Sequence, residues 1–315
     1  MAVAFTFPGQ GSQAVGMGKE LADAFPEARR VFQEVDDALA ENLSKLIWEG
    51  PEETLTLTAN AQPALMAVSL AAIRALEARG FSLKDKVAYV AGHSLGEYSA
   101  LAAAGFVSVA DAARLLRIRG NAMQAAVPAG EGAMAAIIGL EQADVEAACS
   151  EAAQGAGKVC QIANDNGGGQ LVISGAKTAV ELAAKLCTEK GAKRALMLQV
   201  SAPFHSALMA PAANVMRDAL SGVAKHAPAV PVLSNVTVTP TSDPDEIARR
   251  LVEQITGRVR WRETVEWFGA NGVATLYEIG AGKVLSGLAR RINRDIATAS
   301  VGTSADVEAA LAALA

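Results

Sequence analysis

The stretch Gly92-His93-Ser94-Leu95-Gly96 has the Gly-x-Ser-x-Gly pattern, which places a serine on a sharp turn between a strand and a helix. An apolar run over residues 87–91 suits a buried strand before it, and residues 97–104 are rich in helix formers. On such a turn the helix N-terminus directs backbone N–H groups at developing negative charge. We interpret Ser94 as a candidate nucleophile. The alternative is a helix-capping serine in an ordinary strand–helix turn.

Strands and helices alternate on both sides of this turn, and this pattern predicts an α/β fold. With the serine turn, it favours a large domain that is similar to α/β hydrolases. Strands are expected over 3–7, 87–91, 230–238 and 273–279. Helices are expected from the end of Gln62-Pro63 to Gly80, over 109–126, 245–256 and 261–270, and from Gly282 through Arg291.

Residues 132–200 follow a different order, β-α-β-β-α-β, which predicts a small ferredoxin-like α+β domain. The strands are 132–140, 159–163, 170–174 and 194–200, and the helices are 142–153 and 178–190. The expected domains are therefore 1–128 with 201–315, and an insertion over 129–200. The run Asn164-Asp165-Asn166-Gly167-Gly168-Gly169 indicates a hairpin turn. A phosphate-cradling loop is the alternative, although the lysine and the spacing of a P-loop are missing.

Composition excludes several classes of function. The 315 residues are 51% apolar with a net charge of −5, which is typical of a globular protein and not of a nucleic-acid binder. No apolar run reaches the ~20 residues of a membrane span, and residues 1–8 look like a first strand, not a signal peptide. Cys149, Cys160 and Cys187 are too widely spaced for a zinc knuckle or a disulfide framework. We expect reduced thiols, a cytoplasmic protein, no metal site and a monomer.

Three histidines could serve as the base for Ser94. His93 should point away from the serine because side chains alternate along a strand. His226 lies in an expected exposed loop, whereas His205 lies where the chain leaves the inserted domain, which is a cleft position. Histidine is the usual base for a serine nucleophile, so His205 is the candidate; a lone histidine would otherwise be structural more often than catalytic. If the pKa of His205 has the ordinary value of ~6.5, the rate of acyl transfer should fall as the pH drops through that value.

Five segments in one order resemble the malonyl-CoA:acyl carrier protein transacylases of fatty-acid synthesis and the acyltransferase domains of polyketide synthases. The resemblance covers nearly the whole chain. The segments are Phe7-Pro8-Gly9-Gln10-Gly11-Ser12-Gln13, Gly92-His93-Ser94-Leu95-Gly96-Glu97-Tyr98, Arg119-Gly120, Phe204-His205-Ser206, and Gln254 before Trp261.

The resemblance implies a catalytic role for three side chains or backbone groups. Ser94 matches the nucleophile that carries the acyl group, and His205 matches the general base that takes its proton. Gln254 matches the residue that orients the histidine, largely through its backbone carbonyl. From its sequence context alone, Gln254 is an ordinary helix residue.

The same resemblance implies the groups that hold the substrate. The backbone N–H groups of Gln10 and Leu95 match the oxyanion hole, and Arg119 matches the arginine that pairs with the malonyl carboxylate. A guanidinium grips a carboxylate through two parallel hydrogen bonds. The alternative is that Arg119 belongs to a solvated helix face. Arg117 and Arg119 are two positions apart and cannot share one face of a helix.

Thioester exchange needs no redox group, so no cofactor is expected and coenzyme A enters only as the thioester substrate. The implied partners are malonyl-CoA and holo acyl carrier protein, an acidic helical protein that bears phosphopantetheine. The densest basic segment, Arg290-Arg291-Ile292-Asn293-Arg294 with Lys283 nearby, is a candidate docking surface. The alternative is a helix end whose cations favour the dipole.

Two other functions remain open on the sequence alone. A serine esterase or thioesterase would share the turn, but it expects the chain order Ser, Asp or Glu, His with no domain between. A carrier-protein scaffold without activity is a non-enzymatic alternative. The presence of Ser94, His205 and Arg119 weighs against it.

Overall fold

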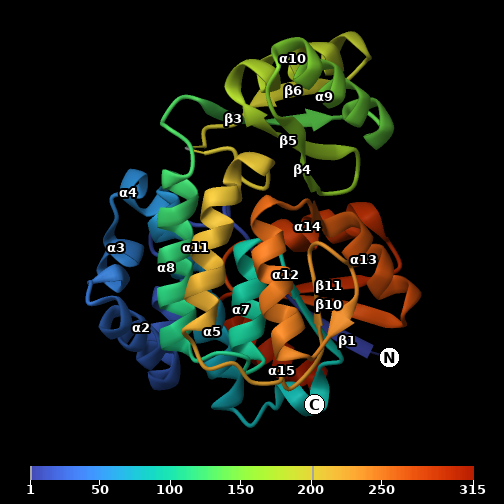
Figure 1. Cartoon of the computed structure of the whole chain (residues 1–315). Coiled ribbons are helices and arrows are strands. Elements are labelled where there is room, and N and C mark those ends of the chain that lie inside the picture. The colour runs from blue at the N-terminus through green and yellow to red at the C-terminus, as the bar shows by residue number, and fades with distance from the viewer. Residues whose placement is uncertain (1, 201) are drawn as a thin grey trace.

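A computed structural model describes residues 2–200 and 202–315, which form two β-sheets covered by helices (Figure 1). Residues 1 and 201, which the expected domain boundaries include, lie outside the described residues. The larger sheet is parallel except at one edge, where β8 runs antiparallel to β7. Its strands, in spatial order, are β11 (Ala297–Val301), β10 (Val273–Ile279), β1 (Ala2–Phe7), β2 (Tyr89–Gly92), β7 (Val232–Leu233) and β8 (Pro240–Thr241).

The helices around this sheet enclose the main core. Helix α5 (Thr58–Glu77) is buried on nearly every face, which fits its apolar composition on all sides. It packs against α2 (Pro26–Leu39), α7 (Leu95–Ala103) and α8 (Val109–Ala125). The remaining helices are α1 (Lys19–Ala24), α3 (Leu43–Glu49), α4 (Glu52–Thr56), α6 (Leu83–Lys86), η1 (Ala207–Met209), α11 (Ala210–Ser221), α12 (Pro244–Thr256), α13 (Trp261–Ala270), α14 (Val284–Ile292) and α15 (Ser304–Leu314).

The smaller sheet is built mainly from residues 132–197, where all six predicted elements are present in the predicted order. In spatial order its strands are β6 (Arg194–Met197), β3 (Gly132–Ile138), β5 (Gln170–Ala176), β4 (Cys160–Asp165) and β9 (Val259–Arg260). Figure 1 shows α9 (Gln142–Ala156) and α10 (Lys177–Glu189) on the side of this sheet that faces away from the larger one. The core beneath them contains all three cysteines as free, buried thiols.

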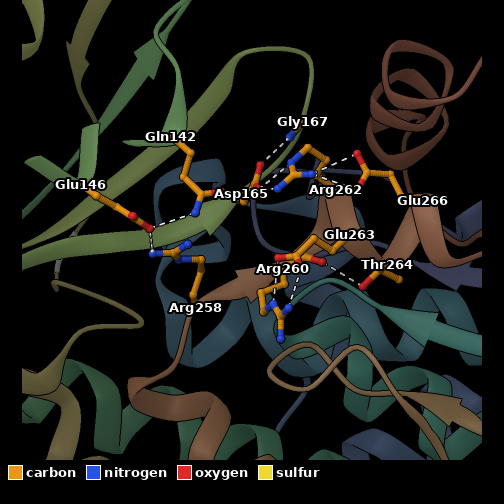
Figure 2. A network of polar contacts seen from close by, with 10 residues as sticks. All are labelled: Gln142, Glu146, Asp165, Gly167, Arg258, Arg260, Arg262, Glu263, Thr264 and Glu266. Carbon is orange, nitrogen blue, oxygen red and sulfur yellow. Dashed lines mark hydrogen bonds and ion pairs between the residues drawn. The ribbon is translucent and has the colours of Figure 1, made fainter. Parts of the chain in front are cut away.

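The last strand of the smaller sheet, β9, was not predicted, because its two residues come from a segment far along the chain. It pairs in parallel with β4. Figure 2 shows the ion pairs that surround this junction: Arg258 with Glu146 at 2.7 Å, and Arg262 with Asp165 at 2.8 Å. Asp165 is 2% exposed, so the second pair is largely desolvated on its acidic side. The smaller sheet is thus joined to the segment between α12 and α13, and to the first turn of α13, by main-chain hydrogen bonds and by ion pairs.

The predicted start of α5 after Pro63 is wrong, because the helix begins at Thr58 and contains the proline. A proline inside a helix frees the carbonyl four residues earlier, here that of Ala59. The Arg117 side chain donates to this carbonyl at 2.7 Å, which replaces the missing bond. The helix can therefore run through Pro63 because a neighbouring helix satisfies the freed acceptor.

The predicted strand over 230–238 is also wrong, because only Val232–Leu233 form a strand there. The chain turns directly afterwards, with the Val238 N–H donating to the Ser234 carbonyl at 3.0 Å and Val238 at φ 54°. An apolar run does not reveal such a turn, because valine rarely adopts a positive φ. The turn brings Asn235 beneath the serine motif, as described below.

No helix among the described residues is long and apolar enough to cross a membrane. Within the same residues, no group of three or more His, Cys, Asp or Glu side chains could hold a metal ion.

Candidate active site

The Gly-x-Ser-x-Gly stretch forms a tight turn between β2 and α7. Ser94 has φ 55° and ψ −110°, a conformation that costs free energy in a non-glycine residue and is typical of functional sites. A Cβ atom at Gly92 would lie 1.9 Å from the Gly96 carbonyl, and one at Gly96 would lie 2.2 Å from the Phe7 oxygen. Glycine is therefore required at both positions, because neighbouring backbone atoms leave no room for a Cβ atom. The Ser94 side chain makes no capping hydrogen bond to α7, so the interpretation as a helix cap is wrong.

Ser94 and His205 meet although they are 111 positions apart in the chain. Ser94 Oγ lies 2.7 Å from His205 Nε2, and His205 Nδ1 lies 2.8 Å from the Gln254 backbone carbonyl. A carbonyl can only accept, so Nδ1 carries the proton and Nε2 presents its lone pair to the serine hydroxyl. The three predicted residues thus form one hydrogen-bonded chain, in the tautomer that a base needs.

His205 is almost fully buried, at 3% exposure. Burial lowers its pKa to about 3, and the positive charge of Arg119 acts in the same direction. The imidazole is therefore neutral across the physiological range. The condition of an ordinary histidine pKa is therefore not met, and acyl transfer is no longer expected to slow near pH 6.5.

Arg119 lies on α8 with 1% of its surface exposed, so the interpretation as a solvated helix face is wrong. Its guanidinium donates to Gln62 Oε1 at 2.7 Å, Gln254 Oε1 at 2.9 Å and Ser94 Oγ at 3.1 Å. These three acceptors are all neutral. Its Nε is a buried donor without an acceptor among the described residues. The side chain therefore brings a positive charge within hydrogen-bond distance of Ser94 Oγ without an acidic group of the described residues in direct contact, which favours an anionic ligand.

Arg117 points elsewhere, as the helical spacing predicts. It donates to the Ala59 carbonyl and to Asn60 Oδ1, and it forms an ion pair with Glu41 at 2.6 Å. Its charge is thus engaged away from Ser94.

Three further site residues, Gln62, Glu97 and Asn235, were missed by sequence reasoning. Asn235 Oδ1 accepts from the Ser94 N–H at 2.8 Å, and its amide donates to the Gly92 carbonyl at 2.7 Å, which braces the turn. Glu97 accepts from Gln254 Nε2 at 2.8 Å, and its burial raises its pKa to about 7. A glutamate in an otherwise apolar helix is a signal of a buried polar partner, and this signal could have identified it.

A cavity of about 650 Å³ opens above Ser94, between the two sheets. The segments around the larger sheet supply Gln10, Leu95 and Arg119 to its wall, and the smaller sheet supplies Met134 and Val172. Leu95 is the first residue of α7, so its N–H has no acceptor within the helix. The two residues of the predicted oxyanion hole therefore line the same cavity as Ser94.

A hairpin turn joins β4 and β5 as predicted, but only residues 166–169 of the Asn/Gly run form it, because Asn164 and Asp165 belong to β4. The Asn166 N–H donates to the Gln170 carbonyl at 3.0 Å, and Gly167, Gly168 and Gly169 all have positive φ. Its asparagine side chains also reach the cavity wall, where Asn166 Oδ1 lies 2.9 Å from His93 Nε2. His93 is directed at Asn166 and at the Trp261 ring, and His226 lies in an exposed loop as expected.

Comparisons with known proteins place this geometry in context. The acyl transferase domain family matches residues 4–305. A malonyl CoA-acyl carrier protein transacylase of Bacillus subtilis (strain 168) is 46% identical over 312 residues, 99% of this chain and 97% of that protein. A solved acyl-carrier-protein-S-malonyltransferase from Bartonella henselae is 65% identical with a TM-score of 0.98, over 100% of this chain and 99% of that one. A malonyl-transacylase solved in complex with a type II PKS acyl-carrier protein is 45% identical with a TM-score of 0.95. The match covers 99% of this chain and 100% of that one.

The mixed α/β fold, the serine site and the family match together define an enzyme of the acyltransferase class. Within the acyl transferase domain family, the chain belongs to the malonyl CoA-acyl carrier protein transacylases. The resemblance carried by the five sequence segments is thereby confirmed.

Proposed function

We propose that this enzyme transfers the malonyl group from malonyl-CoA to the phosphopantetheine thiol of holo acyl carrier protein, through a covalent malonyl ester on Ser94. The transfer would supply extender units for fatty-acid synthesis. One observation carries the proposal: Ser94 Oγ lies within hydrogen-bond distance of a neutral imidazole, 2.7 Å away, and of a buried guanidinium, 3.1 Å away. The first group activates the nucleophile and the second binds a carboxylate beside it.

In the first half-reaction, His205 Nε2 takes the proton of Ser94 as Oγ attacks the thioester carbonyl carbon. The carbonyl oxygen becomes an oxyanion and accepts from the N–H groups of Gln10 and Leu95. Donors of this kind are worth ~10²–10³ in rate apiece. The carbon–sulfur bond then breaks, and the coenzyme A sulfur leaves with the proton from His205.

In the second half-reaction, the phosphopantetheine thiol gives its proton to His205 and attacks the ester carbonyl. The bond to Ser94 Oγ breaks, and the serine regains its proton from His205. The imidazolium formed in each half donates through Nδ1 to the Gln254 carbonyl, which stabilises it. The two halves use one site in turn, so the kinetics should be ping-pong. The thioester supplies the reactivity, and no cofactor enters the scheme.

The arrangement behind His205 also bears on the esterase alternative. That class orients its histidine with a carboxylate, whereas here Nδ1 donates to a backbone carbonyl. The buried Arg119 supports a carboxylate-bearing acyl group over a simple ester. Both features favour malonyl transfer.

Basic side chains at the mouth of the cavity support an acidic carrier as the partner. Lys283 and Arg291 are exposed and line the cavity where α14 begins and ends. Arg290 and Arg294 are exposed beside them. An acidic protein that docks here would direct its prosthetic arm at Ser94. The expectation that the enzyme acts as a monomer stays a prediction.

The domain division is part of the same proposal. Residues 1–128 and 201–315 would form a discontinuous domain similar to α/β hydrolases, and 129–200 an inserted ferredoxin-like domain. The strand order β6-β3-β5-β4 and a core cluster drawn from residues 133–187 support the insertion. The strand β9 adds a fifth strand from the larger domain.

The test is intact-mass analysis after incubation with malonyl-CoA. A malonyl adduct should form on the wild type, should be missing from Ser94→Ala, and should be discharged by holo carrier protein. Discharge by water at a comparable rate would favour the thioesterase alternative. A wild type that acquires no adduct would contradict the proposal and favour the scaffold.

A further inference from the structure

Glu97 is a buried carboxylate at the base of the site that the proposed mechanism does not use. It lies on α7, one turn after Ser94, and is 1% exposed. Its Oε2 accepts from Gln254 Nε2 at 2.8 Å and from the Asn235 N–H at 3.2 Å. A carboxyl group rarely occupies such a position without a charged partner, so its counter-charge needs to be identified.

That counter-charge is Arg119. It is connected to Glu97 by hydrogen bonds through the side-chain amide of Gln254. The Gln254 side chain accepts from Arg119 Nη2 at 2.9 Å through Oε1, and it donates to Glu97 through Nε2. Its oxygen thus faces the cation and its nitrogen faces the carboxylate, which is the favourable orientation of the amide dipole. Because Gln254 is fully buried, this relay is shielded from solvent. The three side chains therefore form one electrostatic unit.

Other charges near Glu97 have partners of their own. Arg250 is the second cation beside it, and Arg250 forms an ion pair with Glu246 and donates to the Thr239 carbonyl at 2.9 Å. The groups that face Glu97 come from three helices and one connection: Tyr98 on α7, Arg119 on α8, Arg250 and Gln254 on α12, and Asn235 between β7 and β8. His205 stays neutral over the working range and adds no charge.

We propose that Glu97 and the malonyl carboxylate share Arg119, so that Glu97 takes up one proton from solvent when the malonyl group enters the site. This inference rests on the proposed function, in which Arg119 pairs with that carboxylate. In the empty site the charges of Arg119 and ionised Glu97 cancel. The malonyl carboxylate adds one negative charge and the proton adds one positive charge, so the buried cluster stays neutral.

Burial already holds the pKa of Glu97 near 7, even with Arg119 close by. A second carboxylate on the same arginine raises that pKa further, because like charges disfavour ionisation. Malonyl loading at a pH above about 7 must therefore recruit a proton, whereas loading of an acetyl group, which has no carboxylate, does not. Glu97 would thus be a positioning residue that also sets the pH range of malonyl preference.

The experiment compares the malonyl-to-acetyl ratio of kcat/KM from pH 6 to pH 9. Titrations common to both substrates, such as those of coenzyme A, cancel in this ratio. In the wild type the ratio should fall above pH 7, by up to about tenfold per pH unit. In Glu97→Gln, which keeps the shape but cannot ionise, the ratio should be flat. An equal fall in the wild type and in Glu97→Gln would overturn the proposal, and so would a flat ratio in the wild type.

A second measurement keeps Glu97 intact and covers the case in which Glu97→Gln fails to fold. Malonyl-CoA is bound to Ser94→Ala, and proton uptake is measured by calorimetry at pH 8 in buffers of different ionisation enthalpy. Close to one proton should be taken up per malonyl-CoA and none per acetyl-CoA. Equal uptake for the two ligands would refute the proposal. Failure of the proposed function would be distinct, because the wild type would then form no malonyl ester at all.

Discussion

Replacing Arg119 with alanine should change the choice of substrate more than the chemistry. The guanidinium is 1% exposed, so its loss would leave the malonyl carboxylate in a desolvated site without a cation. Breaking a buried pair in this way costs ~3–5 kcal/mol. At ~1.4 kcal/mol per decade, kcat/KM for malonyl-CoA should fall by ~10²–10³-fold or more.

Acetyl-CoA has no carboxylate and escapes this penalty. Both substrates lose the hydrogen bond from Arg119 Nη2 to Ser94 Oγ, so that loss cancels when the two are compared. The assay is therefore the malonyl-to-acetyl ratio of kcat/KM, measured at pH 6.5 for wild type and Arg119→Ala. Arg119→Lys should also lower the ratio, because a point charge cannot form two parallel hydrogen bonds.

Arg117→Ala is the matched control, since Arg117 lies on the same helix but pairs with Glu41. It should leave the ratio unchanged, even if the loss of its bond to the Ala59 carbonyl destabilises α5. An unchanged ratio in Arg119→Ala would show that another group reads the carboxylate and would refute the assignment.

Three further outcomes are expected. His205→Ala should slow the formation of the Ser94 ester by at least ~10², measured by quenched-flow mass analysis, and normal acylation would make His205 structural. Because the pKa of His205 is lowered to about 3, transfer from acetyl-CoA should be independent of pH between 5 and 8, and a fall centred near pH 6.5 would contradict this environment. Hydrolysis of the malonyl ester should be far slower than discharge to phosphopantetheine, and radiolabel release at equal rates would count against a transferase.

Sequence reasoning located the parts of this site that have local signatures. The glycines around Ser94 are needed within a five-residue window, so the turn could be predicted from that window alone. The spacing of Arg117 and Arg119 already showed that they face different ways. The four strands and two helices between residues 132 and 197, and the hairpin at Gly167, also follow from local patterns.

The features that were missed depend on contacts between distant segments. Gln62 holds Arg119 from 57 positions away, and Asn235 holds the Ser94 backbone from 141 positions away. Nothing in the neighbourhood of either residue marks it as part of a site. The run of α5 through Pro63 likewise depends on Arg117, which lies on another helix. The helices α11 and α15 and the strand β11 were not assigned, because the alanine-rich composition blurs the contrast between buried and exposed positions.

The strand β9 has a consequence for building chimeras from related enzymes. It begins only a few residues after Gln254, whose carbonyl holds His205, and it completes the smaller sheet beside β4. A graft of residues 129–200 alone would leave this strand behind and would separate Asp165 from Arg262 (Figure 2). A chimera that keeps this strand pair and this ion pair must therefore exchange two segments of the chain. They are residues 129–200 and residues 258–262.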